Sequence, residues 1–250
     1  MIFLVLGLGA AGMAWGVEST LARLGWGWLG VTLAGWGGLS LAGSGRPWGK
    51  RSDGTFPAWH WVGCAPGHLV LAISMWIRRG AAGPVPAHEV VPRVWLGRRL
   101  MTDEARVADL LGIGAILDLT EEYAEPRALR RGRRYLNLPV PDFHAPTLEQ
   151  VADGVAFIRE ARRQGPVYVH CAAGRGRSAL VVAAFLLAEQ RVETVGEAVE
   201  FLQRIRPEVL LVDGQRARLE EYAASLGGGR AGPPERARFH PSGPPNRPGG

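Results

Sequence analysis

Cysteine and lysine are scarce in this chain, and both absences restrict its function. Only Cys64 and Cys171 occur among 250 residues, and Cys64 lies in an apolar segment, so we expect no disulfide framework. No spacing typical of a zinc site and no glycine loop typical of nucleotide binding is present, so we expect no metal and no cofactor. Lys50 is the only lysine, and the net charge of +6 rests on arginine. Without a nucleic-acid-binding motif, this charge does not predict a nucleic-acid partner.

Charge is absent from long stretches near the N-terminus. Residues 1–17 and 24–43 contain no charged side chain, and residues 56–77 are apolar apart from two histidines and a serine. Because apolar stretches of about 17–25 residues span a bilayer as helices, residues 1–79 are predicted to form a membrane region with two or three transmembrane helices. The first stretch is short enough to lie along the membrane interface instead, and Pro66 is expected to kink the last one.

Arg78 and Arg79 directly follow the last apolar stretch. By the positive-inside rule they predict a protein of the bacterial inner membrane with a cytoplasmic catalytic domain. A catalytic thiolate would need the same reducing compartment. The basic residues of the middle loop run against this rule if that loop is external: Arg46, Lys50 and Arg51.

The rest of the chain divides into a linker at residues 80–89, a catalytic domain at 90–226 and a Gly/Pro/Arg-rich tail at 227–250 that is expected to be disordered. Within the catalytic domain, strand-like and helix-like segments alternate, which predicts an α/β fold with a central, mostly parallel sheet flanked by helices. The expected strands are 90–96, 113–119, 134–140 and 166–170. The expected helices are 102–111, 147–163, 178–190, 194–205 and 213–226. The expected core includes Val181, Val182, Phe185, Leu186, Phe201, Leu202, Ile205, Leu210 and Leu211.

The candidate site is a loop between the last strand and the helix after it. Val167-Tyr168-Val169 is typical of a buried strand, and the Ala/Leu/Val-rich residues 179–189 are typical of a buried helix. At such a junction the backbone N–H groups and the helix N-terminus face one concavity and attract an anion. The loop consists of His170, Cys171, Ala172, Ala173, Gly174, Arg175, Gly176, Arg177 and Ser178.

The residue types in this loop fit phosphate chemistry. Amide donors that bind an anion also favour the thiolate of Cys171, which can attack phosphorus. The planar guanidinium of Arg177 can hold two phosphoryl oxygens at once, and the two glycines permit close backbone approach. Ser178 is placed to donate to the departing sulfur, and His170 is expected to orient the loop. The alternative, a buried structural cysteine before a helix, would leave the arginine, the glycines and the serine unexplained.

The loop resembles the H-C-x5-R-[S/T] signature of the cysteine-dependent, dual-specificity phosphatases. The resemblance extends over about residues 90–226, beginning with Val94-Trp95-Leu96-Gly97, which is similar to the family's opening strand. It implies metal-free hydrolysis of phosphomonoesters through a phosphocysteine intermediate, with residues 170–176 binding the phosphate.

The resemblance also points to a general acid. In this family an aspartate on a loop about thirty residues upstream of the cysteine protonates the leaving oxygen. Asp142 has that offset and lies in a proline-containing segment before Thr147, a candidate N-cap of the next helix. Asp142 is therefore the candidate acid, and Asp118 and Asp153 are weaker candidates.

Three further segments are similar to the branch typified by the mitochondrial phosphatidylglycerophosphate phosphatase: residues 116–123, residues 142–148 and Gly154-Val155-x-Phe157. This resemblance implies a phospholipid phosphate as substrate. The same signature serves phosphotyrosine, phosphoserine and phosphothreonine proteins, so a membrane-tethered protein phosphatase is the alternative. A phosphate-binding adaptor without turnover and a rhodanese-like sulfurtransferase are weaker alternatives, because all expected catalytic residues are present and rhodanese loops are usually one residue shorter.

An arginine cluster lies between two of the expected strands. It can contact anionic headgroups or an anionic substrate, or it can form a solvated loop. The cluster consists of Arg127, Arg130, Arg131, Arg133 and Arg134.

Overall fold

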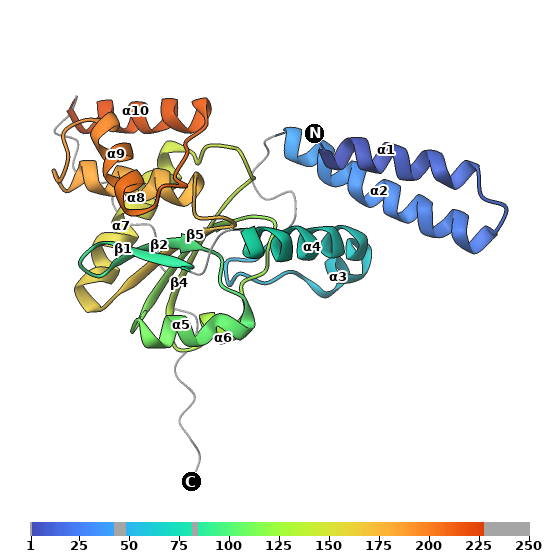
Figure 1. Ribbon diagram of the computed structural model, residues 1–250, viewed down its shortest axis with the longest axis horizontal. Helices are drawn as coiled ribbons and strands as arrows, with labels where there is room; N and C mark the ends of the chain where they lie inside the picture. The colour runs from blue at the N-terminus through green and yellow to red at the C-terminus, as the bar shows by residue number, and fades with distance from the viewer. Residues whose placement is uncertain (1, 43–48, 82–84, 228–250) are drawn as a thin grey trace, which may run out of the picture.

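The computed structural model describes residues 2–42, 49–81 and 85–227 (Figure 1). The predicted membrane region contains four helices, α1 (Ile2–Trp15), α2 (Thr20–Ala42), α3 (Ala58–Gly63) and α4 (Ala65–Ala81). Helices α1 and α2 lie side by side as a hairpin. The interruption between α3 and α4 falls beside Pro66, as expected for a residue that lacks the N–H needed inside a helix.

The apolar helices are the main departure from the sequence-based expectation. Within the described ranges, no helix combines the length and the apolar character needed to cross a membrane. Helix α1 has 14 residues and α4 has 17, fewer than the roughly 20 that a bilayer requires. Helix α2 has 23 residues, but glycine and tryptophan recur along it and lower its mean hydropathy. The prediction of two or three transmembrane helices in residues 1–79 is therefore not supported.

The predicted catalytic domain, residues 90–226, contains the expected sheet. Its strands are β1 (Ala87–Val91), β2 (Val94–Arg98), β3 (Ala115–Thr120), β4 (Arg134–Val140) and β5 (Val167–Cys171), in the order β1-β2-β5-β3-β4. All pairs are parallel except β1–β2, which confirms the mostly parallel α/β sheet. The strand expected at 90–96 is instead a hairpin. Its first strand begins inside the predicted linker, whose residues 82–84 lie outside the described part.

Helices cover both faces of the sheet (Figure 1). One face packs against α7 (Leu148–Gln164), α8 (Arg177–Ala188), α9 (Val195–Ile205) and α10 (Asp213–Gly227). The other face packs against α5 (Ala105–Leu110) and α6 (Arg127–Arg130), and the short 3-10 helix η1 (Thr102–Glu104) directly precedes α5. Alternate strand residues face opposite sides: Leu117 and Val169 belong to the first core, and Ile116 and Tyr168 to the second.

This architecture fixes the position of the candidate loop. Strand β5 lies in the middle of the sheet, and α8 is buried from Arg177 to Leu187. The loop joining them therefore emerges at the carboxyl end of the central strand, where ligand sites of open α/β sheets are found. The predicted N-cap also forms, since Thr147 Oγ1 accepts from the N–H of Gln150 at 3.1 Å. The predicted tail beyond residue 227 lies outside the described residues.

Candidate active site

The loop between β5 and α8 packs tightly against strand β2. Gly174 has φ of +69°, and a Cβ at this position would lie 2.3 Å from the carbonyl oxygen of Gly97. Any other residue would meet both the backbone strain and this contact. Glycine at position 174 therefore allows the loop to turn close to the backbone of β2.

The carbonyl groups of the loop are held by the surrounding scaffold. Arg206 is only 1% exposed, and it donates from Nε to Gly174 O (3.0 Å) and from Nη2 to Ala173 O (3.1 Å). The other loop carbonyls, those of residues 172, 175 and 176, accept from the backbone N–H groups of Arg99, Leu210 and Leu180. Sequence reasoning missed Arg206, because its role depends on a contact across 32 residues of chain.

Cys171 lies at the base of the loop beside two buried polar side chains. It is 3% exposed, and Ser178 Oγ donates to its sulfur at 3.3 Å. His170 is fully buried, with Nδ1 3.4 Å from the carbonyl oxygen of Cys171. Burial lowers the pKa of His170 to about 4, so the imidazole is neutral at pH 7.

Arg177 is held by two carboxylates at the first turn of α8. Its Nη1 and Nη2 lie 2.9 and 2.8 Å from the two oxygens of Glu122, and Nη2 lies 2.9 Å from Asp142 Oδ1. Nη1 also donates to Val140 O at 2.7 Å. Burial works against ionisation of Glu122, but Arg177 beside it holds the pKa of that carboxyl below its usual value. Glu122 was noticed only as part of a family-like segment, and the structure brings it into the site.

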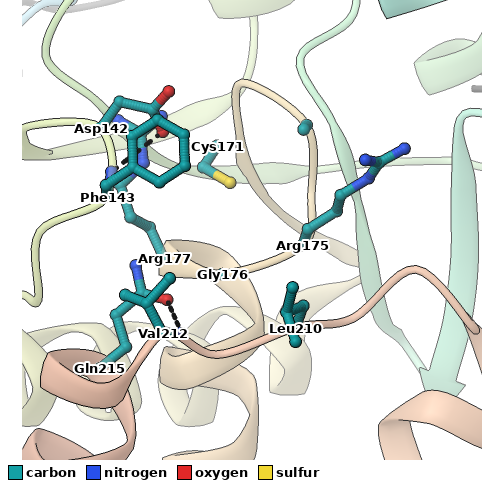
Figure 2. Close-up of a pocket in the computed structure, with 10 residues that line it drawn as sticks. Asp142, Phe143, Cys171, Arg175, Gly176, Arg177, Leu210, Val212 and Gln215 are labelled. Carbon is teal, nitrogen blue, oxygen red and sulfur yellow. Dashed lines mark hydrogen bonds and ion pairs between the residues drawn. The ribbon is translucent and has the colours of Figure 1, made fainter. Parts of the chain in front are cut away.

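A pocket of about 220 Å³ opens above Cys171 (Figure 2). Its other lining residues are Asp142, Phe143, Ala173, Arg175, Gly176, Arg177, Leu210, Val212 and Gln215. Phe143 and Leu210 are 70% and 69% exposed and form apolar parts of the rim, so placing Leu210 in the core was wrong. The Arg175 side chain extends away from the sulfur (Figure 2).

The pocket includes one of the three candidate acids. Asp142 lies in it with Cys171 and Arg177, whereas Asp153 lies in α7 and does not line it. Asp118 is fully buried in β3, and Lys50 Nζ lies 2.7 Å from its Oδ2.

Behind the loop, three buried residues form a possible set of metal ligands. Ligand atoms of Asp118, Glu125 and His170 lie within 4.8 Å of one another. The ammonium of Lys50 already provides a positive charge at Asp118. Lys50 therefore supplies a positive charge to the cluster of Asp118, Glu125 and His170.

The arginine cluster is largely engaged in structural contacts. Arg130 Nε and Arg133 Nε donate to the carbonyls of Glu125 (3.1 Å) and Ile113 (2.9 Å). Arg134 Nη2 lies 2.7 Å from Glu160 Oε2. Arg127 and Arg131 are exposed. Three of the five arginines therefore have contacts within the fold, which neither expected role, a headgroup contact or a solvated loop, had included.

Comparison with known proteins identifies the class. Residues 94–225 match the family model described as dual specificity phosphatase, catalytic domain. The chain belongs to the dual-specificity phosphatases and thereby to a family of phosphoric monoester hydrolases.

Individual relatives point to one branch of that family. The chain is 35% identical over 147 residues to phosphatidylglycerophosphate phosphatase PTPMT2 of Arabidopsis thaliana, covering 56% of this chain and 58% of that protein. It is 33% identical over 153 residues to human phosphatidylglycerophosphatase and protein-tyrosine phosphatase 1, covering 54% and 72%. Human dual specificity protein phosphatase 1 is 31% identical over 126 residues, covering 50% and 33%. The matched region thus spans little more than half of the first plant relative, and 35% of another, PTPMT1.

Solved structures agree with this assignment. The crystal structure of PTPMT1 in complex with PI(5)P superposes with a TM-score of 0.53 at 26% identity, covering 57% of this chain and 97% of that one. The active form of Tk-PTP gives a TM-score of 0.52 at 29% identity, covering 56% and 97%.

Proposed function

We propose that this protein hydrolyses the phosphomonoester of a membrane phospholipid through a phosphocysteine intermediate. The observation that carries the proposal is the convergence of three side chains on one pocket: Cys171 at its base, Arg177 beside it and Asp142 at its edge. Nucleophile, anion clamp and proton donor are the groups that such a reaction needs.

The first step forms the bond between phosphorus and sulfur. The Cys171 thiolate attacks phosphorus, and the bond to the leaving oxygen breaks while Asp142 transfers its proton to that oxygen. Arg177 and the loop amides hold the phosphoryl oxygens, whose charge grows in the transition state. Because Asp142 pairs with Arg177 before substrate arrives, the phosphate must take over its place on the guanidinium.

The second step breaks the bond between phosphorus and sulfur. Water attacks phosphorus, and its proton passes to Asp142, which now acts as a base. The electron pair of the breaking bond returns to sulfur, where Ser178 donates a hydrogen bond at 3.3 Å. Inorganic phosphate leaves, and the thiolate is regenerated without a metal or an added cofactor.

Two observations favour a phospholipid. The relatives include proteins named for phosphatidylglycerophosphate, and PTPMT1 was crystallised with a phosphoinositide. The exposed apolar side chains of Phe143 and Leu210 on the pocket rim suit the glycerol and acyl parts of a lipid better than the solvated flanks of a peptide. A phosphoprotein substrate is the second candidate, because relatives also include dual-specificity protein phosphatases.

We also propose that α1, α2 and α4 rest on a lipid surface. Their exposed large apolar side chains form far more apolar surface than scattered single residues would. They include Leu8, Trp15, Leu21, Leu24, Val31, Leu69, Ile73 and Trp76. Such an association would hold the pocket near its substrate, and the thiolate would require the reducing, cytoplasmic side.

Phosphate release tests the substrate. The full chain is mixed with vesicles containing phosphatidylglycerophosphate, vesicles containing phosphoinositides, and soluble phosphotyrosine peptides, with Cys171→Ser as the blank. We expect the fastest Cys171-dependent release from a lipid. Faster release from peptides would establish the protein-phosphatase alternative. Binding of phosphate without release from any substrate would support the adaptor, and sedimentation with vesicles tests the lipid surface separately.

A further inference from the structure

Lys50 lies outside the family-matched residues 94–225, yet it is buried against β3, the strand that pairs with β5 beside the reactive loop. Its Nζ donates to Asp118 Oδ2 (2.7 Å), to the carbonyl of Thr120 (2.8 Å) and to the hydroxyl of Thr120 (3.1 Å). An ammonium has three N–H donors, and all three have an acceptor here. A buried ammonium whose donors all have acceptors indicates a specific structural role, because each donor left without an acceptor would destabilise the folded state.

Lys50 belongs to the segment of residues 49–56, which packs against the sheet and which we call the strap. Gly54 O accepts from the N–H of Glu125 at 2.9 Å. Gly54 has φ of +78°, and a Cβ there would lie 2.3 Å from the hydroxyl oxygen of Tyr135. That hydroxyl donates to Asp118 at 2.6 Å. The strap and the sheet therefore close around the same carboxylate.

One connection runs from Lys50 to the anion clamp. Thr120 is the last residue of β3, and Glu122, two residues later, holds both terminal nitrogens of Arg177. Lys50 binds the carbonyl oxygen of Thr120 and so fixes the point from which Glu122 extends.

A second connection runs from Lys50 to the nucleophile. Asp118 Oδ1 lies 4.0 Å from Nδ1 of His170, the residue directly before Cys171. Burial opposes the charge on Asp118, but Lys50, His170 and two hydrogen bonds hold the pKa of Asp118 well below its usual value.

The groups facing His170 come from every element around it. Asp118 of β3 favours the charged imidazole, whereas burial, Lys50 of the strap and Arg99 after β2 favour the neutral one. Glu125 Oε2 lies 3.6 Å from Nε2, and the Tyr168 ring stacks at 5.5 Å.

We propose that Lys50 is a positioning residue for the phosphatase reaction, which anchors the end of β3 behind the Glu122–Arg177 pair and holds the Asp118 carboxylate in place behind His170. This inference rests on the proposed function, since it concerns the same reaction. The strap then contributes to catalysis, although it lies outside the residues that match the family model.

Steady-state kinetics of the full chain on an aryl phosphate, from pH 5 to 8, tests the proposal. The variants are Lys50→Met, Lys50→Arg and the double variant Lys50→Met/Asp118→Asn, and Arg51→Met is the matched control because its exposed cation is the neighbour in the strap. Lys50→Met should lower kcat by about 10- to 100-fold while KM changes by less than about 3-fold, because the clamp is misplaced and not removed. Lys50→Arg should recover part of kcat, because it restores a donor and a positive charge at the end of β3.

The double variant separates the loss of the Lys50 hydrogen bonds from the effect of an unpaired charge on Asp118. With Asp118 neutral, no carboxylate is left unpaired, but kcat should stay below that of the wild type because Thr120 O has lost its donor. If Lys50→Met does not fold, the double variant, which leaves no unpaired buried charge, carries the test. Wild-type kcat at every pH in whichever of the two variants folds would overturn the proposal. A wild type no faster than Cys171→Ser would instead refute the proposed function, so the two failures are distinguishable.

Discussion

Glu122 and Arg177 form a two-pronged ion pair, with each carboxylate oxygen within 2.9 Å of a different guanidinium nitrogen. The pair fixes the plane of the guanidinium before a phosphate arrives. Arg177 is 2% exposed, so its orientation depends on protein partners and not on water. The clamp is therefore pre-organised by a residue that need not touch the substrate.

Changing Glu122→Gln should weaken both the fold and the reaction. The amide keeps the shape but removes the more buried of the two carboxylates that pair with Arg177 and leaves Asp142, a loss of up to about 3–5 kcal/mol in the free energy of unfolding. We expect kcat/KM to fall by about 10²-fold as the guanidinium loses its fixed plane. Denaturant unfolding and steady-state kinetics measure the two effects, with exposed Glu149→Gln as the control. An unchanged kcat/KM would contradict the clamp.

Ser178→Ala should slow the second chemical step more than the first. The variant loses the hydroxyl that donates to the departing sulfur, at a cost of about 10²-fold in hydrolysis of the phosphocysteine. Rapid mixing with an aryl phosphate should then show a burst of aryl alcohol followed by slow turnover. A slow reaction without a burst would mean that Ser178 serves the first step instead.

Asp142→Asn should discriminate between leaving groups. An alkyl phosphate needs a proton on its leaving oxygen, so its kcat should fall by about 10²–10⁴-fold, whereas an activated aryl phosphate should lose much less. Asp153→Asn is the matched control, since this aspartate lies in α7 away from the pocket lining. If the control variant showed the discrimination and Asp142→Asn did not, the acid would be misassigned.

Glu125→Gln should stabilise the protein increasingly as pH rises. Burial, reinforced by the charge of Asp118, raises the pKa of Glu125 to about 8, so the folded chain keeps a proton that the unfolded chain releases above about pH 4.5. The stabilisation that Glu125 gives the wild type is therefore fully present at low pH. It is lost between about pH 4.5 and 8, where the free energy of unfolding falls by up to about 1.4 kcal/mol per pH unit. Melting temperatures of both proteins from pH 5 to 8 should diverge with rising pH, and parallel curves would argue against a buried neutral Glu125.

The sequence predicted those parts of the fold that depend on local pattern. Strands β3, β4 and β5 fall within about two residues of the expected positions, because continuous apolar runs bounded by turn residues specify buried strands. The reactive loop was predictable for the same reason, since all nine of its residues are contiguous. Asp142 was found only through the family's loop order, not through local pattern.

The remaining contacts join distant parts of the chain and leave no local signal. Lys50 meets Asp118 across 68 residues, and Arg206 meets the loop across 32. Neither position is distinguished by its neighbours, and the sequence placed Lys50 only among the basic residues of the loop between two apolar stretches. The prediction of transmembrane helices failed for a different reason. It took the absence of charge as high hydropathy, although these segments are rich in glycine and tryptophan.

The grip of Arg206 on the reactive loop has a consequence for the direction of the loop's dipoles. In a planar trans peptide, C=O and N–H point in opposite directions. Since the carbonyls of Ala173 and Gly174 are both turned to the Arg206 guanidinium, the N–H groups of Gly174 and Arg175 in the same peptide planes are turned away from it. These N–H groups are thus oriented before any anion binds, and binding needs no rotation of their peptide planes.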